Sequence, residues 1–355
     1  MTGVGDSEAL ARLAYELVAV PSATGQEAAL ADLVEGRCRA LPGVAVERLG
    51  NAVVARSGER EDAVALVGHL DTVPPWEGHA PTLEGTRVIG RGAADMKGGD
   101  AAILAVLEHC AAAGGDVVCV FYDREEGPNR ENGIHAVLAD SHLLGRPDFA
   151  FVGEPTGGEI HAGCVGVVNG DVVFHGRSAH SARPWEGDSA VLKAVPFLQR
   201  AAAVAQRPVE VEGLTFHDTL CITEIRGGVA RNVVPDRLEI ALNVRFAPGR
   251  EAAAARREVE QLVAGEGELT WIDESPAAPP RLSEPVLTRF LAETGVRVLP
   301  KQAWTDVASL QAHGIPAVNY GPGEAHQAHQ PGEWVEGEAI ARVASTLARF
   351  LSARR

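Results

Sequence analysis

The stretch AVALVGHLD, residues 63–71, decides the fold class of this 355-residue chain. Its first part is an unbroken apolar run, which is typical of a strand that is buried on both faces of a parallel sheet. The run ends in His69 and Asp71, and open parallel sheets bind their ligands outside the carboxyl ends of their strands. The stretch therefore predicts an α/β domain with a polar site at the end of a buried strand.

Similar patterns surround this stretch. Residues 117–122 and 149–153 are further apolar runs, and residues 97–113 are rich in Ala and Leu, which predicts a helix between strands. Upstream, residues 6–56 predict two helices followed by a hairpin at an Asn-containing turn. This alternation of strand and helix implies layers of helices on a mostly parallel sheet.

Five residues of the types that bind metal ions lie in short, sharply bounded motifs: His69, Asp95, Glu126, Glu154 and His329. Two imidazoles and three carboxylates suit a pair of borderline divalent ions such as zinc. Because three of these residues follow apolar runs, they can meet at one edge of a parallel sheet. Asp95 would then be the carboxylate that bridges two ions, as a two-metal hydrolase requires.

Each of these residues has a plainer interpretation when it is taken alone. His69 could simply end a strand, and Asp95 could cap the helix that follows it. His326 competes with His329 for the role of ligand. On the residues alone, these alternatives stay open.

The neighbouring glutamates Glu125 and Glu126 often indicate no more than a solvated loop. Here they follow an apolar run, and consecutive side chains at a strand end point in different directions. We therefore assign Glu126 to the metal and Glu125 to the substrate side, as the general base. Asp71, two residues after His69, is expected to orient that imidazole from behind.

The pattern of predicted elements changes near residue 167, from alternating buried strands and helices to half-buried strands with helices between them. Strand and helix patterns follow at residues 168–175, 187–203, 220–226, 238–246 (a less clean alternation) and 250–263. Residues 275–280 are rich in proline and predict an extended linker. Since His329 is assigned to the same site as His69, we expect a catalytic domain of residues 1–166 and 281–355, with an α+β module of residues 167–280 inserted in it.

The composition excludes several classes of function. A formal net charge of −16 argues against nucleic acid as a partner, because phosphate binding needs a basic face. No segment is long and apolar enough to span a membrane. The five cysteines are scattered and lack a CxxC pair, and residues 1–6 show no apolar signal region, so we expect a cytoplasmic protein with free thiols. An anionic substrate would have to be held by local arginines.

Taken together and in order, these motifs resemble the zinc-dependent aminoacylase/carboxypeptidase family over nearly the whole chain. Its markers are GHLDTVP (68–74), GRG to DMKGG (90–99), Glu125-Glu126, GEPT (153–156), GRSAHSARP (176–184), NVVPD (232–236) and His329 with Glu333 four residues later. Each marker is weak by itself, but the ordered set is specific. The family includes acetylornithine deacetylase and succinyl-diaminopimelate desuccinylase.

The resemblance implies two zinc ions, with cobalt or manganese as an alternative at one site. The implied ligands are His69 and Glu154 for one ion, Glu126 and His329 for the other, and Asp95 between them. The spacing to Glu333 favours His329 over His326. The family pattern also implies a cis peptide bond between Asp95 and Met96.

The inserted module resembles the family's lid and dimerisation domain, so a homodimer through this module is expected. The resemblance implies that His180 reaches the site of the partner subunit and polarises the scissile carbonyl group. The residues expected to bind substrate carboxylates are Arg177, Arg183, Arg231, Asn232 and Arg245.

Within the family, residues 176–188 and 243–248 look most like desuccinylases of the actinobacterial type. The expected reaction releases succinate from N-succinyl-LL-2,6-diaminopimelate and supplies diaminopimelate for lysine biosynthesis. Proteobacterial enzymes have a Gly-Thr-Ser-Asp-type loop where this chain has Ala303–Asp306, and they lack the arginines around His180. The alternatives are an acetylornithine deacetylase, a related deacylase or metallopeptidase, and a binding protein without catalysis, against which the intact Glu125 argues.

Overall fold

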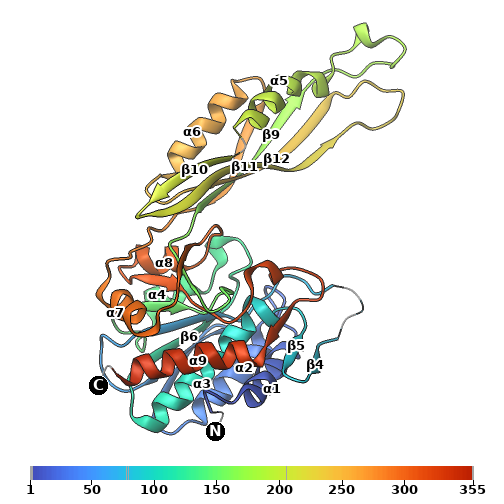
Figure 1. The fold of residues 1–355 in the computed structure, drawn as a ribbon. Coiled ribbons are helices and arrows are strands. Elements are labelled where there is room, and N and C mark those ends of the chain that lie inside the picture. Colours follow the sequence, from blue (N-terminus) through green and yellow to red (C-terminus); the bar gives the residue numbers. More distant parts are fainter. Residues whose placement is uncertain (1–2, 77, 79, 205, 354–355) are drawn as a thin grey trace. The chain divides into compact units, whose positions relative to one another are not determined.

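The structure is a computed structural model that describes residues 3–76, 78, 80–204 and 206–353. The chain divides into two compact units (Figure 1). Unit 1 contains Met1–Gly163, Arg281–Leu299 and Thr305–Arg355, and unit 2 contains Cys164–Pro280 and Pro300–Trp304. Unit 2 thus begins three residues earlier than the sequence suggests, and it also includes a short segment beyond the proline-rich stretch.

Unit 1 is built on an eight-stranded sheet with the order β1-β2-β6-β3-β7-β15-β8-β14. Its centre is parallel: β3 (Ala65–His69) pairs with both β6 (Val117–Tyr122) and β7 (Ala150–Val152), and β7 pairs with β15 (Ala317–Asn319). Every residue of β3 and β6 is buried, as their unbroken apolar runs predict. The other strands are β1 (Val44–Leu49), β2 (Ala52–Ser57), β8 (Ile160–Ala162) and β14 (Val298–Pro300).

Helices cover this sheet on both faces, which confirms the α/β prediction (Figure 1). On one face α1 (Ser7–Val18), α3 (Gly98–Ala113) and α9 (Gly337–Ser352) pack against one another, and on the other α4 (Ile134–Asp140) contacts α8 (Val307–Ala312). The remaining helices of the unit are α2 (Ala28–Arg39) and α7 (Pro285–Thr294).

Aromatic side chains join the first and last segments of the chain into one unit. Phe151 of β7 lies 4.8 Å from Phe290 of α7 and 6.2 Å from Phe350 of α9, between ring centroids. Tyr320, just after β15, lies 5.2 Å from Phe290. These buried rings remove large apolar areas from water, so residues far apart in the sequence share one core.

A small third sheet also joins distant segments. Its order is β16-β5-β4, where β4 (Thr82–Glu84) and β5 (Arg87–Ile89) form a hairpin and β16 (Trp334–Glu336) pairs antiparallel with β5. The turn that precedes β16 carries His329, and the turn that follows β5 leads to Asp95. This sheet therefore brings two of the expected ligand segments together.

Unit 2 is an antiparallel sheet with two helices on one face, which confirms the α+β expectation (Figure 1). The strand order is β10-β11-β12-β9-β13, with bounds Gln206–Val211, Leu214–Gly227, Arg237–Phe246, Gly166–His175 and Glu268–Ser275. Residues of α5 (Ala190–Ala203), α6 (Ala252–Val263), β9 and β12 share one apolar core. Where the sequence alternates least cleanly, β12 alternates strictly in burial.

The chain enters and leaves unit 2 along paired backbone. Cys164 and Ala278 form an isolated antiparallel bridge, and each donates its N–H to the carbonyl oxygen of the other at 3.0 Å. All five cysteines are free thiols, and four of them are buried. Among the described residues, no helix has the length and apolar character that a membrane crossing demands.

Candidate active site

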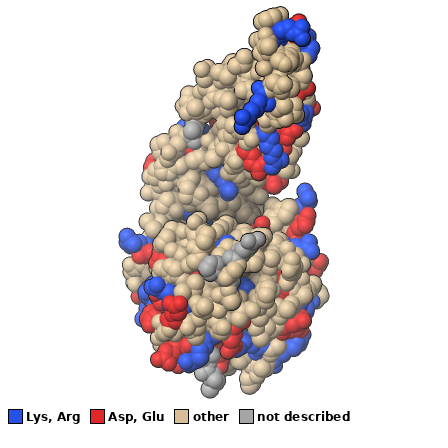
Figure 2. All heavy atoms as spheres, turned by 90° about the vertical axis from the view of Figure 1, so that its right-hand side faces the viewer, with Lys and Arg blue, Asp and Glu red and all other residues tan. Residues whose placement is uncertain are grey.

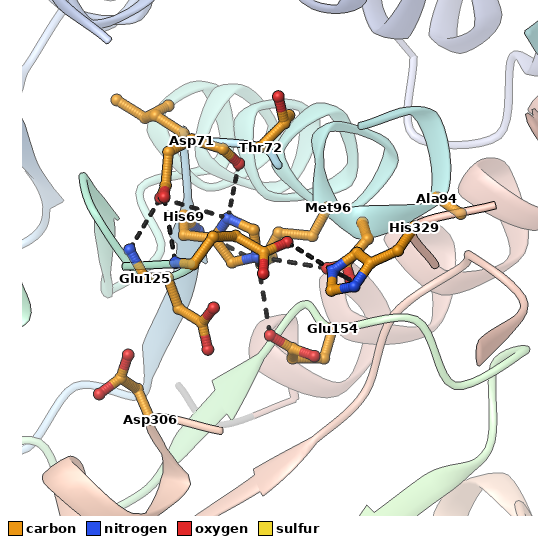
Figure 3. A network of polar contacts seen from close by, with 12 residues as sticks. His69, Asp71, Thr72, Ala94, Met96, Glu125, Glu154, Asp306 and His329 are labelled. Atoms are coloured by element: carbon orange, nitrogen blue, oxygen red, sulfur yellow. Dashed lines mark hydrogen bonds and ion pairs between the residues drawn. The ribbon is translucent and has the colours of Figure 1, made fainter. Parts of the chain in front are cut away.

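Three neighbouring strands of unit 1 end at the same edge of the sheet, and there they present polar side chains (Figure 3). His69 is the last residue of β3, Glu125 and Glu126 follow β6, and Glu154 follows β7. Because β6, β3 and β7 are parallel, their carboxyl ends lie side by side. The order of the strands thus brings three separate sequence motifs into one site.

Asp95 and His329 reach this edge on irregular backbone. Asp95 lies in the π-helical turn η1 (Ala93–Lys97) with non-helical φ and ψ of −120° and 94°, and its peptide bond to Met96 is cis, which confirms the implied geometry. Helix α3 begins only at Gly98, so Asp95 does not cap it. His329 follows the 3₁₀ turn η4 (Ala325–Gln327) and has a φ of 64°.

The carboxylate of Asp95 lies between two histidines. Its Oδ1 is 3.3 Å from Nε2 of His69, and its Oδ2 is 3.6 Å from Nε2 of His329. His69 Nε2 also lies 3.8 Å from Oε1 of Glu154, whereas His329 Nε2 lies 2.8 Å from Oε1 of Glu126. Each oxygen of Asp95 therefore belongs to a separate group of one imidazole and one further carboxylate.

These side chains could hold metal ions. Ligand atoms of His69, Asp95 and Glu126 lie within 4.8 Å of one another. His326, the competing histidine, is exposed in η4 and has no part in the contacts that join this group. The geometry thus favours His329 for the position beside Glu126.

The charges around the two histidines indicate a site that attracts cations. Burial disfavours the charged form of His69, but the hydrogen bond with Asp95 and the charges of Glu125 and Asp71 outweigh it, so the pKa of His69 is raised well above its ordinary value. The hydrogen bond to Glu126 raises the pKa of His329. The carboxylates around both rings thus favour positive charge at this place, which is the environment that a divalent cation needs.

Glu125 lies beside these groups but shares none of their histidine contacts (Figure 3). Burial raises the pKa of Glu125 well above its ordinary value; the charge of His69 opposes this, and the charge of Glu154 adds to it. A carboxyl group with a raised pKa can accept and return a proton near neutral pH. Its surroundings therefore fit the general base that the sequence predicts.

Asp71 differs in part from its prediction. The nearest partner of His69 Nδ1 is the backbone carbonyl oxygen of Asp71 at 3.0 Å, whereas the carboxylate oxygen Oδ1 lies at 3.7 Å. The carboxylate instead accepts the backbone N–H groups of Glu125 and Glu126 at 2.9 and 3.0 Å. A strand-end spacing could not reveal this, because the partners are backbone groups of another loop.

Sequence reasoning also missed a buried carboxylate behind the Glu125 loop. Asp306 accepts hydrogen bonds from the Tyr122 hydroxyl and from Nδ2 of Asn132, both at 2.7 Å. Tyr122 precedes the loop that carries Glu125 and Asn132 follows it, so Asp306 holds both ends of that loop. The only sequence signal was the segment Ala303–Asp306, which was noted as a departure from the loop of proteobacterial desuccinylases.

In unit 2, the structure places His180 and Asn232 on adjacent exposed segments. The backbone of His180 bridges to Val233, and the N–H of Ser181 donates to the carbonyl oxygen of Asn232 at 2.9 Å. Nδ1 of His180 accepts the N–H of Ala182 at 3.0 Å. A neutral imidazole in this arrangement carries its proton on Nε2 and presents it to solvent.

The arginines of unit 2 do not form one cluster. Arg177 and Arg183 lie near His180, where Arg177 donates to the carbonyl oxygen of Glu186 at 3.1 Å and Arg183 pairs with its carboxylate at 3.6 Å. Arg245, half-buried, donates to Oδ1 of Asn243 at 2.9 Å near the other end of β12. The eight steps of strand from Arg237 to Arg245 span roughly 26 Å.

Comparisons with known proteins agree with this geometry. The model of peptidase family M20/M25/M40 matches residues 65–353. A Corynebacterium glutamicum protein named succinyl-diaminopimelate desuccinylase is 37% identical over 351 residues, which cover 96% of this chain and 95% of that protein. A Mycobacterium tuberculosis protein, named provisionally as succinyl-diaminopimelate desuccinylase DapE, is 40% identical over 342 residues, covering 96% and 97%.

Solved structures share the fold at low sequence identity. A tripeptidase from Staphylococcus aureus has a TM-score of 0.80 at 20% identity, covering 99% of this chain and all of its own. A dinuclear metal-binding peptidase from Bacillus subtilis has a TM-score of 0.71 at 17% identity and covers 98% of both chains. These structural matches show the fold and nothing finer.

Proposed function

The chain belongs to peptidase family M20/M25/M40, and from this we propose that it is a two-metal amidohydrolase that acts on N-succinyl-LL-2,6-diaminopimelate. The products would be succinate and LL-2,6-diaminopimelate, an intermediate of lysine biosynthesis. The observation that carries the proposal is the position of Asp95, whose two oxygens each face a different histidine. The substrate follows from the desuccinylase relatives, which match nearly the full length of this chain.

The donor atoms fit two zinc ions, with cobalt or manganese as an alternative at one position. The proposed ligands are His69 and Glu154 for one ion, His329 and Glu126 for the other, and Asp95 for both. When bound, such ions polarise a carbonyl group and lower the pKa of a coordinated water. The accumulation of carboxylates around two raised-pKa histidines supports a cation at this place.

Glu125 is the proposed proton carrier of the reaction. In the first step, its carboxylate accepts a proton from the attacking water. In the second step, it donates that proton to the nitrogen of the leaving amine, so that one side chain acts as base and then as acid. The raised pKa of Glu125 supports this role, because a carboxylate of ordinary pKa is a weaker base and would not keep the proton at neutral pH until the leaving amine needs it.

His180 is the proposed donor to the developing oxyanion. Because Nδ1 accepts the N–H of Ala182, the neutral ring has its hydrogen on Nε2, where it can donate to the substrate carbonyl oxygen. Arg245 lies too far along the sheet from His180 for one small substrate to contact both from the same unit 2. We therefore propose that the site takes His180 and Asn232 of the partner subunit.

The free part of strand β11 supports a homodimer. Strand β10 pairs with β11 only from Leu214 to Thr219, so among the described residues the outer edge of Leu220–Gly227 has no partner strand. Exposed apolar side chains lie on this strand and on α5, including Ile225 at 55% and Leu192 at 71% exposure. Open edges and apolar patches of this kind are usually covered by another chain. We propose that unit 2 is the lid and dimerisation domain and that unit 1 is catalytic.

The substrate carboxylates would be held by the side chains predicted for them, Arg177, Arg183, Arg231, Asn232 and Arg245. A charge-assisted pair between a guanidinium and a carboxylate is strong and directional, so a few arginines suffice in an acidic protein. On the face drawn in Figure 2, acidic and basic side chains are interspersed, which favours neither nucleic acid nor an anionic membrane as a partner. With the free thiols, this supports a cytoplasmic enzyme with a small substrate.

The proposal is tested by offering the purified protein N-succinyl-LL-2,6-diaminopimelate, N-acetylornithine and a dipeptide, each with and without a chelator. We expect the succinyl compound to have the highest kcat/KM and the chelator to abolish its hydrolysis until zinc is returned. A preference for acetylornithine would contradict the acyl group but not the reaction. If none of the three is hydrolysed with zinc bound, the proposed function fails.

A further inference from the structure

Glu333 is a fully buried carboxylate beside the site, with no part in the reaction proposed above. Its Oε1 accepts the backbone N–H groups of Ala94 and Asp95 at 2.9 and 3.0 Å. The second of these belongs to the residue whose side chain lies between the two histidines. Glu333 therefore acts directly on the backbone that aims the Asp95 carboxylate.

Arg91 balances the buried charge of Glu333. Its Nη1 lies 3.0 Å from Oε2 of Glu333, its Nε donates to the carbonyl oxygen of Pro74 at 3.2 Å, and its guanidinium lies 4.9 Å from the ring centroid of Trp76. A buried carboxylate is costly unless it is paired and hydrogen-bonded. Here both of its oxygens have partners, so the arrangement is rigid.

The same carboxylate residue also holds the turn of His329. The carbonyl oxygen of Glu333 accepts the N–H of Gly90 at 2.9 Å, and Glu333 stands four residues after His329 and one before β16. Its backbone and its side chain thus contact both ends of the Gly90–Asp95 turn. Besides the pairing of β16 with β5, one residue thus links the position of His329 to that of Asp95.

Asp71 provides a second instance of this arrangement in the same site. Its carboxylate accepts the consecutive N–H groups of Glu125 and Glu126, as that of Glu333 accepts those of Ala94 and Asp95. One acceptor group on two adjacent N–H groups fixes the intervening peptide plane and therefore the direction of the side chain that follows. Two buried carboxylates thus orient the two loops that carry acidic ligands.

We propose that Glu333, neutralised by Arg91, is a positioning residue that aims the Asp95 carboxylate and couples it to the turn of His329. The inference rests on the two-metal site of the proposed function and deepens it. Glutamine at position 333 offers one acceptor oxygen where Glu333 uses two, so its NH2 group must face either the two backbone N–H groups or the Arg91 guanidinium, and Asp95 can then turn away from one ion. Substitution of a residue that holds a metal ligand in place typically lowers metal affinity about 10- to 100-fold.

The chain offers a matched control in the same small sheet. Glu336 of β16 accepts from Nε of Arg87 at 2.7 Å, and Arg87 lies 4.5 Å above the ring of Trp334. This is again a glutamate, an arginine and a tryptophan, but it is partly exposed and bonds no backbone N–H of a ligand loop. Glu336→Gln therefore removes a similar ion pair without touching the site.

The experiment titrates metal-free wild type, Glu333→Gln and Glu336→Gln with Co²⁺ and follows the visible absorbance of the bound ion. We expect wild type and Glu336→Gln each to bind two ions, with affinities that agree between the two proteins. In Glu333→Gln, the affinity for at least one ion should fall by about 10- to 100-fold. With saturating metal, Glu333→Gln should have a lower kcat and a nearly unchanged KM.

The possible outcomes separate the inference from the proposed function. If Glu333→Gln binds Co²⁺ like Glu336→Gln, the positioning role is overturned. If wild type itself fails to bind two ions, the two-metal function fails instead. If circular dichroism shows that Glu333→Gln does not fold, Arg91→Lys provides the test. This variant keeps the positive charge but loses the guanidinium group, which contacts Glu333 and the Pro74 carbonyl oxygen at the same time. We expect a smaller loss of Co²⁺ affinity than in Glu333→Gln. Affinities equal to those of wild type would contradict the proposal.

Discussion

Glu125 and Glu126 are consecutive residues with different surroundings, and this difference supports their proposed roles as proton carrier and metal ligand. Glu126 lies 2.8 Å from His329, whereas burial and nearby carboxylates raise the pKa of Glu125. Asp71 fixes both by accepting their N–H groups. At the scale of single residues, the site depends on carboxylates whose roles are set by their neighbours, as in other acid–base enzymes.

Replacing the general base should stop turnover without emptying the site. We expect Glu125→Gln to lower kcat by about 10²- to 10⁴-fold, because an amide can neither accept the proton of the water nor return it. The metal content, measured by atomic emission, should stay at the wild-type value. A variant with a normal rate would contradict the mechanism.

Asp100 allows a test of stability against pH. It is fully buried on α3, no hydrogen bond to its carboxylate oxygens is found among the described residues, and burial raises its pKa to about 8, with His69 and Lys97 opposing. The folded protein therefore retains this proton between about pH 4 and 8, where the unfolded chain has lost it. The stability contributed by Asp100 is full at low pH and is lost as the pH rises through this window.

Asp100→Asn has no such proton to lose. Relative to this variant, the free energy of unfolding of wild type should fall by up to about 1.4 kcal/mol per pH unit between pH 5 and 8, and then level off. Urea denaturation at pH 5, 6.5 and 8 measures the difference. Parallel profiles for the two proteins would argue against a buried, protonated Asp100.

At the scale of elements, the buried strands of unit 1 were predictable, and the two edge strands of unit 2 were not. β3 and β6 are continuous apolar runs because both of their faces are covered. β10 and β13 escaped prediction because they lie at the edges of the unit 2 sheet, where exposed polar residues and Pro208 replace the apolar pattern. The alternation of β12 became evident only in its burial, since the apolar Ala241 at a partly exposed position obscures it in the sequence.

A charge on the open edge of β11 should separate the proposed dimer. We expect Ile225→Lys to give a monomer in light scattering and to lower hydrolysis by about 10²- to 10³-fold, the usual cost of losing one donor to an oxyanion. Metal binding should not change, because the ligands belong to unit 1.

The matched control is Ile272→Lys. Ile272 lies on β13, the opposite edge of the sheet, and has the same 55% exposure as Ile225. This variant should remain dimeric and active. If Ile272→Lys is a monomer and Ile225→Lys remains a dimer, the interface lies at the β13 edge and the proposed β11 interface is wrong.

At the scale of the whole molecule, the five proposed ligand residues come from segments that span much of the chain, and their signals became specific only as an ordered set. The strand-end positions of His69, Glu126 and Glu154 predicted that these residues meet. The places of Asp95 and His329 were implied by the family resemblance. The supporting contacts of Asp71, Glu333 and Asp306 were not predictable, since they join side chains to backbone or to residues far away in sequence. Such contacts leave no periodic pattern.

Removal of the metal should destabilise the protein, because ions that bind only the folded state add to its stability. At a free concentration of 100 times Kd, one site contributes about 2.7 kcal/mol. We expect a chelator to lower the Tm measured by scanning calorimetry and zinc to restore it. The change in Tm on adding zinc should be as large in His326→Ala as in wild type and smaller in His329→Ala. Equal changes in Tm for all three proteins would exclude His329 as a ligand.

The paired backbone of Cys164 and Ala278 has a consequence for how such a protein can be built. Antiparallel partners lie about 5 Å apart, which is the gap that a two-residue turn closes. The insertion between them can thus be excised and its ends joined by Asn-Gly without moving either end. A shortened protein of this kind would show whether the part of the chain that carries the proposed metal ligands folds alone.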